Sequence, residues 1–135
     1  MLRTKCILEL TALRDGKRVS VMSRHTLSDG KTLDLRITPE KFSEHRIEFA
    51  PPLKLVGAYY RREISWKNYE IEYLKHIRQP SIAEKVKELA LQSRFRDYTL
   101  LCIEEYVPGE PLKCHRRLLA EECKLYEPNL LVYIR

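Results

Sequence analysis

Glycine is scarce in this chain, and the glycine-rich loops that hold nucleotides are missing with it. The 135 residues include only four glycines. No Walker A, G-x-G-x-x-G, H-E-x-x-H or G-x-S-x-G pattern occurs. A glycine-rich phosphate cradle is therefore excluded, and we expect no dinucleotide or other cofactor.

Long apolar runs are absent, and the amide residues Asn and Gln are scarce. No run approaches the roughly 18 residues that a membrane span needs, and Met1–Cys6 lacks the apolar core and cleavage site of a signal peptide. We therefore expect an unprocessed cytoplasmic protein without a membrane partner. Asn and Gln are few beside abundant Glu, Lys and Arg, a composition typical of thermophilic proteins.

The cysteines do not form a metal-binding motif. Cys6, Cys102, Cys114 and Cys123 include no C-x-x-C pair, and without an export signal we expect free thiols, although one pairing among the four stays open. A zinc site needs about four ligands in tetrahedral reach, and adjacent Cys114 and His115 would be an awkward pair of ligands. We expect no metal.

The net charge of +6, with a pI of about 9.2, raises the possibility of a polyanionic partner. Acidic residues interrupt most basic runs, as in Arg61-Arg62-Glu63. Interspersed charge is typical of a solvated surface. We favour that interpretation, and nucleic-acid binding is the alternative.

Hydrophobic periodicity predicts strands separated by helices. Strands are expected over Lys5–Leu13, Arg18–Met22, Tyr98–Ile103 and Asn129–Ile134. A short helix is expected to begin at Pro39, and a longer one, capped by Ser65, is expected over 66–77. A third helix should begin with a Ser81–Glu84 capping box, and a fourth should cover Pro111–Leu125. The segment Leu53–Tyr60 fits either a helix or a strand.

This order of elements predicts one compact three-layer α/β domain over residues 1–135, with a mostly parallel sheet covered by helices on both faces. The strands Arg18–Met22 and Tyr98–Ile103 should run parallel, which places Arg24 and Cys102 at the same edge. Ligands of open α/β sheets bind at that carboxyl edge.

Reactive side chains gather where the strand Tyr98–Ile103 meets the following helix. Cys114, His115 and Arg116 stand near a predicted helix N-terminus, surroundings that lower a thiol pKa. We predict Cys114 as nucleophile or redox thiol, His115 as the group that tunes it or moves protons, and Glu104 as a base or orienting acceptor. Cys102 lies on the same face as Glu104 and fits a binding role or core packing equally well.

An electropositive pocket is the second expectation at this edge. Arg24 and His25 follow the second strand, and beside Cys102 and Arg116 they would suit phosphate, sulfate or carboxylate groups. The predicted partner is an anionic small molecule. Aromatic side chains could line the pocket, namely those of Tyr59, Tyr60, Trp66 and Tyr69, although Trp66 and Tyr69 are favoured as core.

These residues resemble the domain of unknown function (DUF) family 488. Leu100-Leu101-Cys102-x-Glu104, then Cys114-His115-Arg116-x-Leu118-Leu119-Ala120, is similar to the family's L-L-C-x-E strand and C-H-R helix start. Met22-Ser23 stands before Arg24 where many members have an aspartate, and the loop after Glu104 is longer. The resemblance implies a small three-layer α/β fold with a shared polar site, and no established activity.

Three kinds of function stay open. The first is a small-molecule enzyme with a thiol site. The second is a nucleic-acid-binding module in which Arg24, Arg116 and Arg117 contact phosphates. The third is a non-catalytic interaction protein whose Cys-His-Arg motif stabilises a loop–helix junction.

Overall fold

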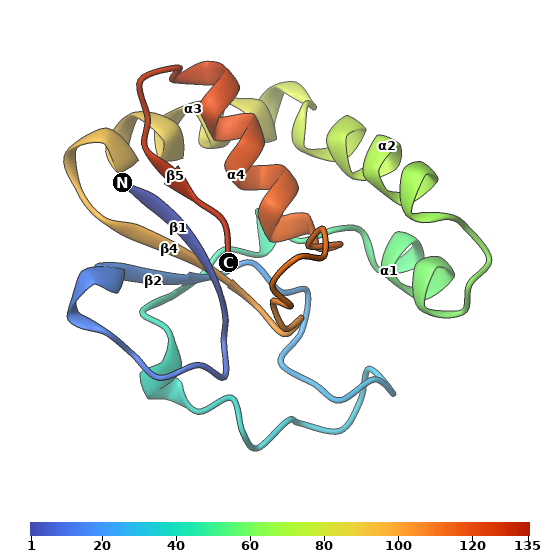
Figure 1. Cartoon of the computed structure of the whole chain (residues 1–135). Coiled ribbons are helices and arrows are strands. Elements are labelled where there is room, and N and C mark those ends of the chain that lie inside the picture. Colours follow the sequence, from blue (N-terminus) through green and yellow to red (C-terminus); the bar gives the residue numbers. More distant parts are fainter.

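Five strands form one parallel sheet (Figure 1). The computed structural model describes residues 1–135, and its strands are β1 (Leu2–Cys6), β2 (Lys17–Ser20), β3 (Glu44–His45), β4 (Tyr98–Cys102) and β5 (Val132–Tyr133). Their order is β3-β2-β4-β1-β5, and every pairing is parallel. The α/β class and the parallel pairing of β2 with β4 are thus confirmed. The carboxyl ends of these two strands lie side by side.

The α-helices pack mainly against one face of the sheet. They are α1 (Leu53–Tyr60), α2 (Trp66–Ile77), α3 (Pro80–Phe95) and α4 (His115–Tyr126). Figure 1 shows α2, α3 and α4 lying together along one side of the strands. Their buried side chains share one hydrophobic core with Leu2, Val19 and Leu100 of the strands. None of the helices combines the length and the apolar character that crossing a membrane requires.

The opposite face is covered by a single helical turn and loops, and the part of it beside that turn is polar. The 3-10 helix η1 (Leu13–Asp15) places Asp15 against it. Thr99 donates a hydrogen bond to the Asp15 carbonyl over 2.7 Å, and the Asp15 carboxylate accepts from Lys5 at 3.1 Å and from Arg18. The expected helical cover on both faces is therefore unequal. Loops instead of an α-helix cover this face, over the charged side chains near η1 and over a small separate apolar cluster that includes Ile7, Met22 and Leu101.

The first strand is earlier and shorter than predicted. The chain leaves the sheet after Cys6, where the Glu9 amide donates to the Cys6 carbonyl over 3.1 Å, and Leu10 is 85% exposed. The predicted strand Lys5–Leu13 is therefore wrong beyond Cys6. Gly16 then turns the chain into β2 with φ of 61°, and a Cβ there would lie 2.1 Å from the Asp97 carbonyl oxygen, so only glycine fits.

The helix predictions hold except at some N-termini. Ser65 caps α2 by accepting from the Asn68 amide over 3.1 Å, as predicted. The ambiguous segment is helix α1. The capping box at Ser81 is wrong, because Pro80 is already the first residue of α3 and Gln79 precedes it. The remaining 3-10 turns are η2 (Pro39–Lys41), which replaces the short helix expected there, and η3 (Ile47–Phe49).

Candidate functional site

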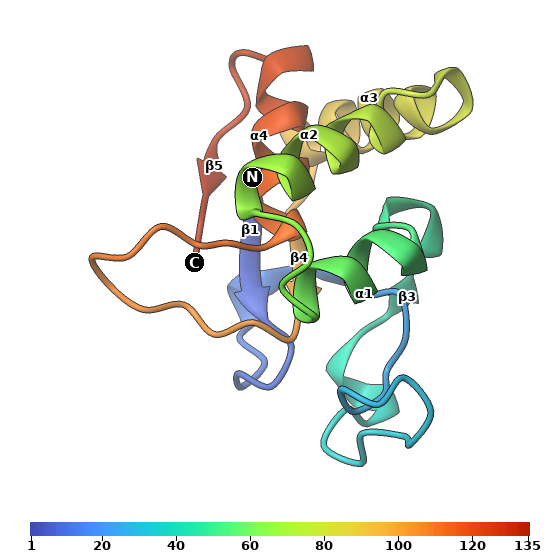
Figure 2. The same ribbon diagram turned by 90° about the vertical axis from the view of Figure 1, so that its right-hand side faces the viewer.

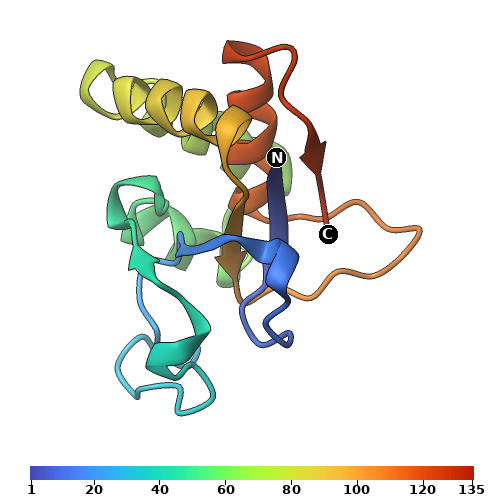
Figure 3. The same cartoon turned by 90° about the vertical axis from the view of Figure 1, so that its left-hand side faces the viewer.

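One loop brings the predicted reactive residues together. Cys102 is the last residue of β4, and Glu104 follows it. The chain then makes a long excursion, which Figures 2 and 3 show projecting from the body beside the C-terminus. It returns at Cys114, the N-cap of α4, and His115, the first residue of that helix. α4 thus begins later than the predicted Pro111.

Four side chains form what we call the thiol cluster: Cys102, Glu104, Cys114 and His115. Glu104 Oε2 lies 2.9 Å from Cys102 Sγ and 3.2 Å from Cys114 Sγ. His115 Nδ1 lies 3.9 Å from Cys114 Sγ and 4.0 Å from Cys102 Sγ. The two sulfurs are therefore both within reach of one carboxylate oxygen and one imidazole nitrogen.

Adjacent Cys114 and His115 reach the same cluster because they differ in backbone conformation. Cys114 is extended, with φ of −148° and ψ of 144°, and the helix starts at the next residue. This change of conformation turns both side chains inward. Cys114 is 2% exposed and Cys102 is 3% exposed, so both thiols are buried.

A main-chain carbonyl fixes the state of the His115 ring. His115 Nε2 lies 2.7 Å from the carbonyl oxygen of Val21, directly after β2. A nitrogen facing a carbonyl must carry a hydrogen, so Nδ1 is the nitrogen that faces the thiols and can accept a proton. The parallel pairing of β2 with β4 supplies this contact, which no side-chain motif could reveal.

Arg116 contributes a buried positive charge behind Cys114. Its Nη1 donates to the Glu104 carbonyl over 2.7 Å, and its Nη2 donates to the Arg135 carbonyl over 2.9 Å. Nη1 also lies 3.8 Å from Cys114 Sγ. The guanidinium is therefore held close enough to stabilise negative charge on the sulfur.

The cluster favours a thiolate on Cys114. Burial and the Glu104 charge raise the pKa of this thiol, but the neighbouring Cys102 thiol and the charge and hydrogen bond of His115 outweigh them and bring its pKa to about 6. Burial lowers the pKa of His115, yet the Cys114 and Glu104 charges raise it overall. Burial and the neighbouring acidic groups raise the pKa of Cys102 well above the ordinary range. These shifts favour a Cys114 thiolate paired with a protonated His115, beside a neutral Cys102 thiol.

Tyr60 is the additional side chain that touches the cluster. Its hydroxyl donates to Glu104 Oε1 over 2.7 Å from the end of α1, although 60% of the residue is exposed. Burial raises the Glu104 pKa, but the His115 charge and the hydrogen bonds from Cys102 and Tyr60 lower it overall, which favours the ionised carboxylate. The sequence placed Tyr60 among possible lining aromatics without a way to single it out.

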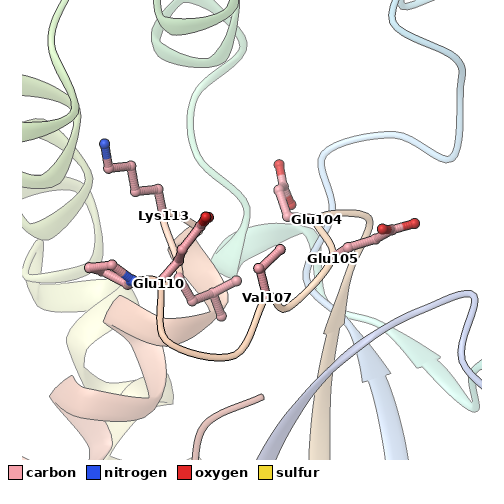
Figure 4. Close-up of a pocket in the computed structure, with 7 residues that line it drawn as sticks. Glu104, Glu105, Val107, Glu110 and Lys113 are labelled. Atoms are coloured by element: carbon pink, nitrogen blue, oxygen red, sulfur yellow. The ribbon is translucent and has the colours of Figure 1, made fainter.

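A pocket opens from Glu104 into the projecting loop (Figure 4). Its volume is about 520 Å³, and its charged lining residues are Glu104, Glu105, Glu110 and Lys113. Figure 4 shows the first two on the arm that leaves β4 and the last two on the returning arm. Three carboxylates against one ammonium make this entrance acidic, in contrast to the expected electropositive pocket.

Arg24 and His25 lie outside the thiol cluster. Arg24 Nη1 donates to the Gly30 carbonyl over 2.8 Å within its own loop. His25 Nε2 pairs with Ser20 Oγ at 2.7 Å, and its ring stacks on that of His45. Both follow β2 at the predicted edge, but local contacts hold them there instead of contacts with the thiols.

The same atoms could also hold a metal ion. Cys102 Sγ, Cys114 Sγ and His115 Nδ1 lie within 4.8 Å of one another, which allows one soft cation to contact all three. The extended backbone of Cys114 removes the objection to adjacent ligands. Tests of thiol reactivity therefore need a chelator to keep the sulfurs free.

Comparison with known proteins adds one finding. The family model DUF488-N3a, described as the active DUF488-N3 subclade, matches residues 2–126. No curated protein and no solved structure matches the chain. The matched range includes all four members of the thiol cluster together with Tyr60 and Arg116.

Proposed function

The chain belongs to the DUF488 family, and from its buried thiol cluster we propose that it is a thiol-dependent enzyme with Cys114 as nucleophile. The main observation behind this proposal is the position of Cys114 at the start of α4. Its Sγ lies 3.9 Å from His115 Nδ1 and 3.8 Å from Arg116 Nη1. Two positive groups thus face the sulfur. Activated cysteine nucleophiles have such electropositive surroundings.

The charges of the site balance when Cys114 is a thiolate. Glu104 and Cys114 then carry one negative charge each, and His115 and Arg116 carry one positive charge each. Glu104 Oε2 lies 3.2 Å from the Cys114 sulfur and repels its negative charge, and the hydrogen bonds that Glu104 accepts from Tyr60 and Cys102 reduce this repulsion. The buried site therefore avoids the free-energy cost of an unpaired ion.

Each group has a role in the proposed reaction. The Cys114 sulfur attacks an electrophilic atom, and the bond to the leaving group breaks. His115 gives its Nδ1 proton to the leaving group, while its Nε2 stays bound to the Val21 carbonyl. Arg116 stabilises negative charge that develops next to the sulfur.

The proposal keeps only part of the predicted preference for an anionic ligand. Arg116 can stabilise an anion that forms at the sulfur, but the acidic entrance disfavours a substrate that arrives with a large negative charge. We therefore propose a small electrophile as substrate. Cys102 has the role of a hydrogen-bond donor to the cluster, and Arg24 and His25 have no part in the proposed step.

We expect iodoacetamide to label Cys114 first at pH 6 in the reduced, chelator-treated protein. A thiol of pKa about 6 is half ionised there, whereas an ordinary thiol is ionised below about 1%. The lower intrinsic nucleophilicity of an acidic thiolate offsets part of this gain, which leaves an advantage of roughly tenfold. Mass spectrometry of each cysteine peptide measures the four rates.

Cys123 is the matched internal control because it lies in the same helix, and burial raises its pKa to about 12. Labelling of Cys123 or Cys6 before Cys114 would show that Cys114 only packs, and the proposed function would fail. A nucleic-acid-binding module, the alternative prediction, requires instead a salt-dependent affinity that Cys114→Ser leaves unchanged.

A further inference from the structure

The two cluster thiols differ from the other two cysteines in sharing a partner. Cys102 and Cys114 both contact Glu104 Oε2, and their sulfurs lie within 4.8 Å of each other. Cys6 Sγ instead donates to the Ile103 carbonyl, and Cys123 Sγ faces the Val86 carbonyl. All four are free thiols in the structure. Cys102 and Cys114 are therefore the one pair of cysteines whose sulfurs contact the same acid–base groups.

Access to this pair restricts the oxidant that can reach it. Both thiols are buried, and the adjoining pocket reaches Glu104 and is lined by three carboxylates and one ammonium. Glutathione is anionic and is disfavoured by the acidic lining, and a protein disulfide would have to reach sulfurs that lie below the surface. A small neutral oxidant such as hydrogen peroxide meets neither obstacle.

We propose that Cys102 and Cys114 form a reversible disulfide when Cys114 reduces a small hydroperoxide. This inference rests on the proposed role of Cys114 as nucleophile and names the substrate class. It assigns Cys102 the role of the resolving thiol, the one that attacks the oxidised Cys114 sulfur.

In the first step the Cys114 thiolate attacks the terminal oxygen of the hydroperoxide. A sulfur–oxygen bond forms and the oxygen–oxygen bond breaks. The departing alkoxide or hydroxide takes the Nδ1 proton of His115 and leaves as alcohol or water. Sulfur loses two electrons to the peroxide, and Cys114 becomes a sulfenic acid.

In the second step the Cys102 thiol gives its proton to Glu104, whose Oε2 lies 2.9 Å from that sulfur. Cys102 then attacks the sulfur of the Cys114 sulfenic acid. The sulfur–oxygen bond breaks, and the hydroxide leaves as water with the proton from Glu104. Two thiols and one hydroperoxide thus give one disulfide, one alcohol or water molecule, and one further water. An external dithiol returns the pair to the reduced state.

The loop between the two cysteines allows the sulfurs to approach. A disulfide needs a sulfur–sulfur distance of about 2.05 Å. Residues 105–111 of the loop are exposed on the surface, and Gly109 at φ of 86° has no atom near the position of a Cβ. Cys114 also precedes the helix and is not held in its interior. The closure is therefore a local movement that leaves the sheet intact.

The test is peroxide treatment of the reduced, chelator-treated full chain with one equivalent of hydrogen peroxide at pH 7. Non-reducing peptide mapping should give a cross-linked Cys102–Cys114 peptide pair that is two hydrogens lighter than the reduced peptides. Dithiothreitol should restore both thiols. In Cys102→Ser, a sulfenic acid on Cys114 should accumulate at least about tenfold above wild type, trapped with dimedone.

Cys6→Ser and Cys123→Ser are the matched controls and should cross-link as the wild type does. A Cys6–Cys102 pair, or a Cys114 sulfenic acid that persists uncross-linked in wild type, would overturn the assignment of Cys102 while leaving Cys114 as nucleophile. A Cys114 that reacts with neither iodoacetamide nor peroxide would remove the proposed function as well. Peptide mapping of the wild-type protein tests the Cys102–Cys114 disulfide even if a variant fails to fold.

Discussion

Replacing His115 by glutamine should raise the pKa at which Cys114 reacts by at least about one unit, which corresponds to about 1.4 kcal/mol of lost thiolate stabilisation. The Cys114 thiol is buried, which disfavours the thiolate, and the charge and hydrogen bond of His115 are among the effects that overcome burial. Glutamine can still donate to the Val21 carbonyl, but it carries no charge. The measurement is the midpoint of the iodoacetamide rate against pH.

The other groups around Cys114 stay in place in this variant. They are Cys102 and Glu104 from the β4 side and Arg116 from α4, and the Tyr73 ring lies beside position 115. His76→Gln is the matched control, because His76 Nε2 faces the Glu48 carbonyl at 3.3 Å and makes no contact with the thiols. An unchanged midpoint in His115→Gln, with native circular dichroism, would show that His115 does not stabilise the thiolate.

Replacing Asp15 by alanine should lower the free energy of unfolding by about 3–5 kcal/mol, because it leaves the buried Arg18 without its carboxylate. Asp15 also accepts from Lys5 and from the Ala12 amide over 3.0 Å, so one carboxylate joins η1 to β1 and β2. Urea unfolding at pH 7 measures the loss. Glu84→Gln is the control, since its exposed pair with Lys87 should be worth less than about 1 kcal/mol.

The pH dependence of this effect has a definite sign. Burial raises the pKa of Asp15, but its hydrogen bonds from Ala12, Lys5 and Arg18 lower it overall. A carboxylate with a depressed folded-state pKa stabilises the fold above its unfolded pKa of about 3.9 and loses this effect as pH falls through the folded value. The advantage of wild type over Asp15→Asn should therefore shrink below pH 4. A constant difference down to pH 3 would contradict an ionised Asp15.

Most of the fold could be predicted because its signals are local. The strand Tyr98–Ile103 is buried throughout and ends one residue early, at Cys102, and the aromatic stripe of α2 begins at its predicted cap. The first strand was predicted to be too long because Leu10 and Leu13 are apolar, although both are exposed in the structure. The charged network under η1 could not be predicted, because it depends on contacts of Asp15 with three different strands.

The sequence predicted which residues belong to the candidate site better than it predicted how they are arranged. Cys102 and Glu104 share a side by the two-residue period of a strand, and Cys114 and His115 lie at a helix start as expected. The Val21 carbonyl and the Tyr60 hydroxyl complete the cluster through tertiary contacts that leave no motif in the sequence. Arg24 was misplaced because the residue that follows a strand end is set by its loop.

The pH dependence of Cys114 alkylation in the wild-type protein tests the central claim most directly. Reduced, chelator-treated protein is reacted with iodoacetamide from pH 4.5 to pH 10, and the Cys114 peptide is quantified by mass spectrometry. A rate that rises with a midpoint at pH about 6, well below the midpoints of Cys6 and Cys123, is the predicted result. A Cys114 midpoint at or above that of an ordinary thiol, about 8.5, would contradict the thiolate–imidazolium pair and with it the proposed enzyme.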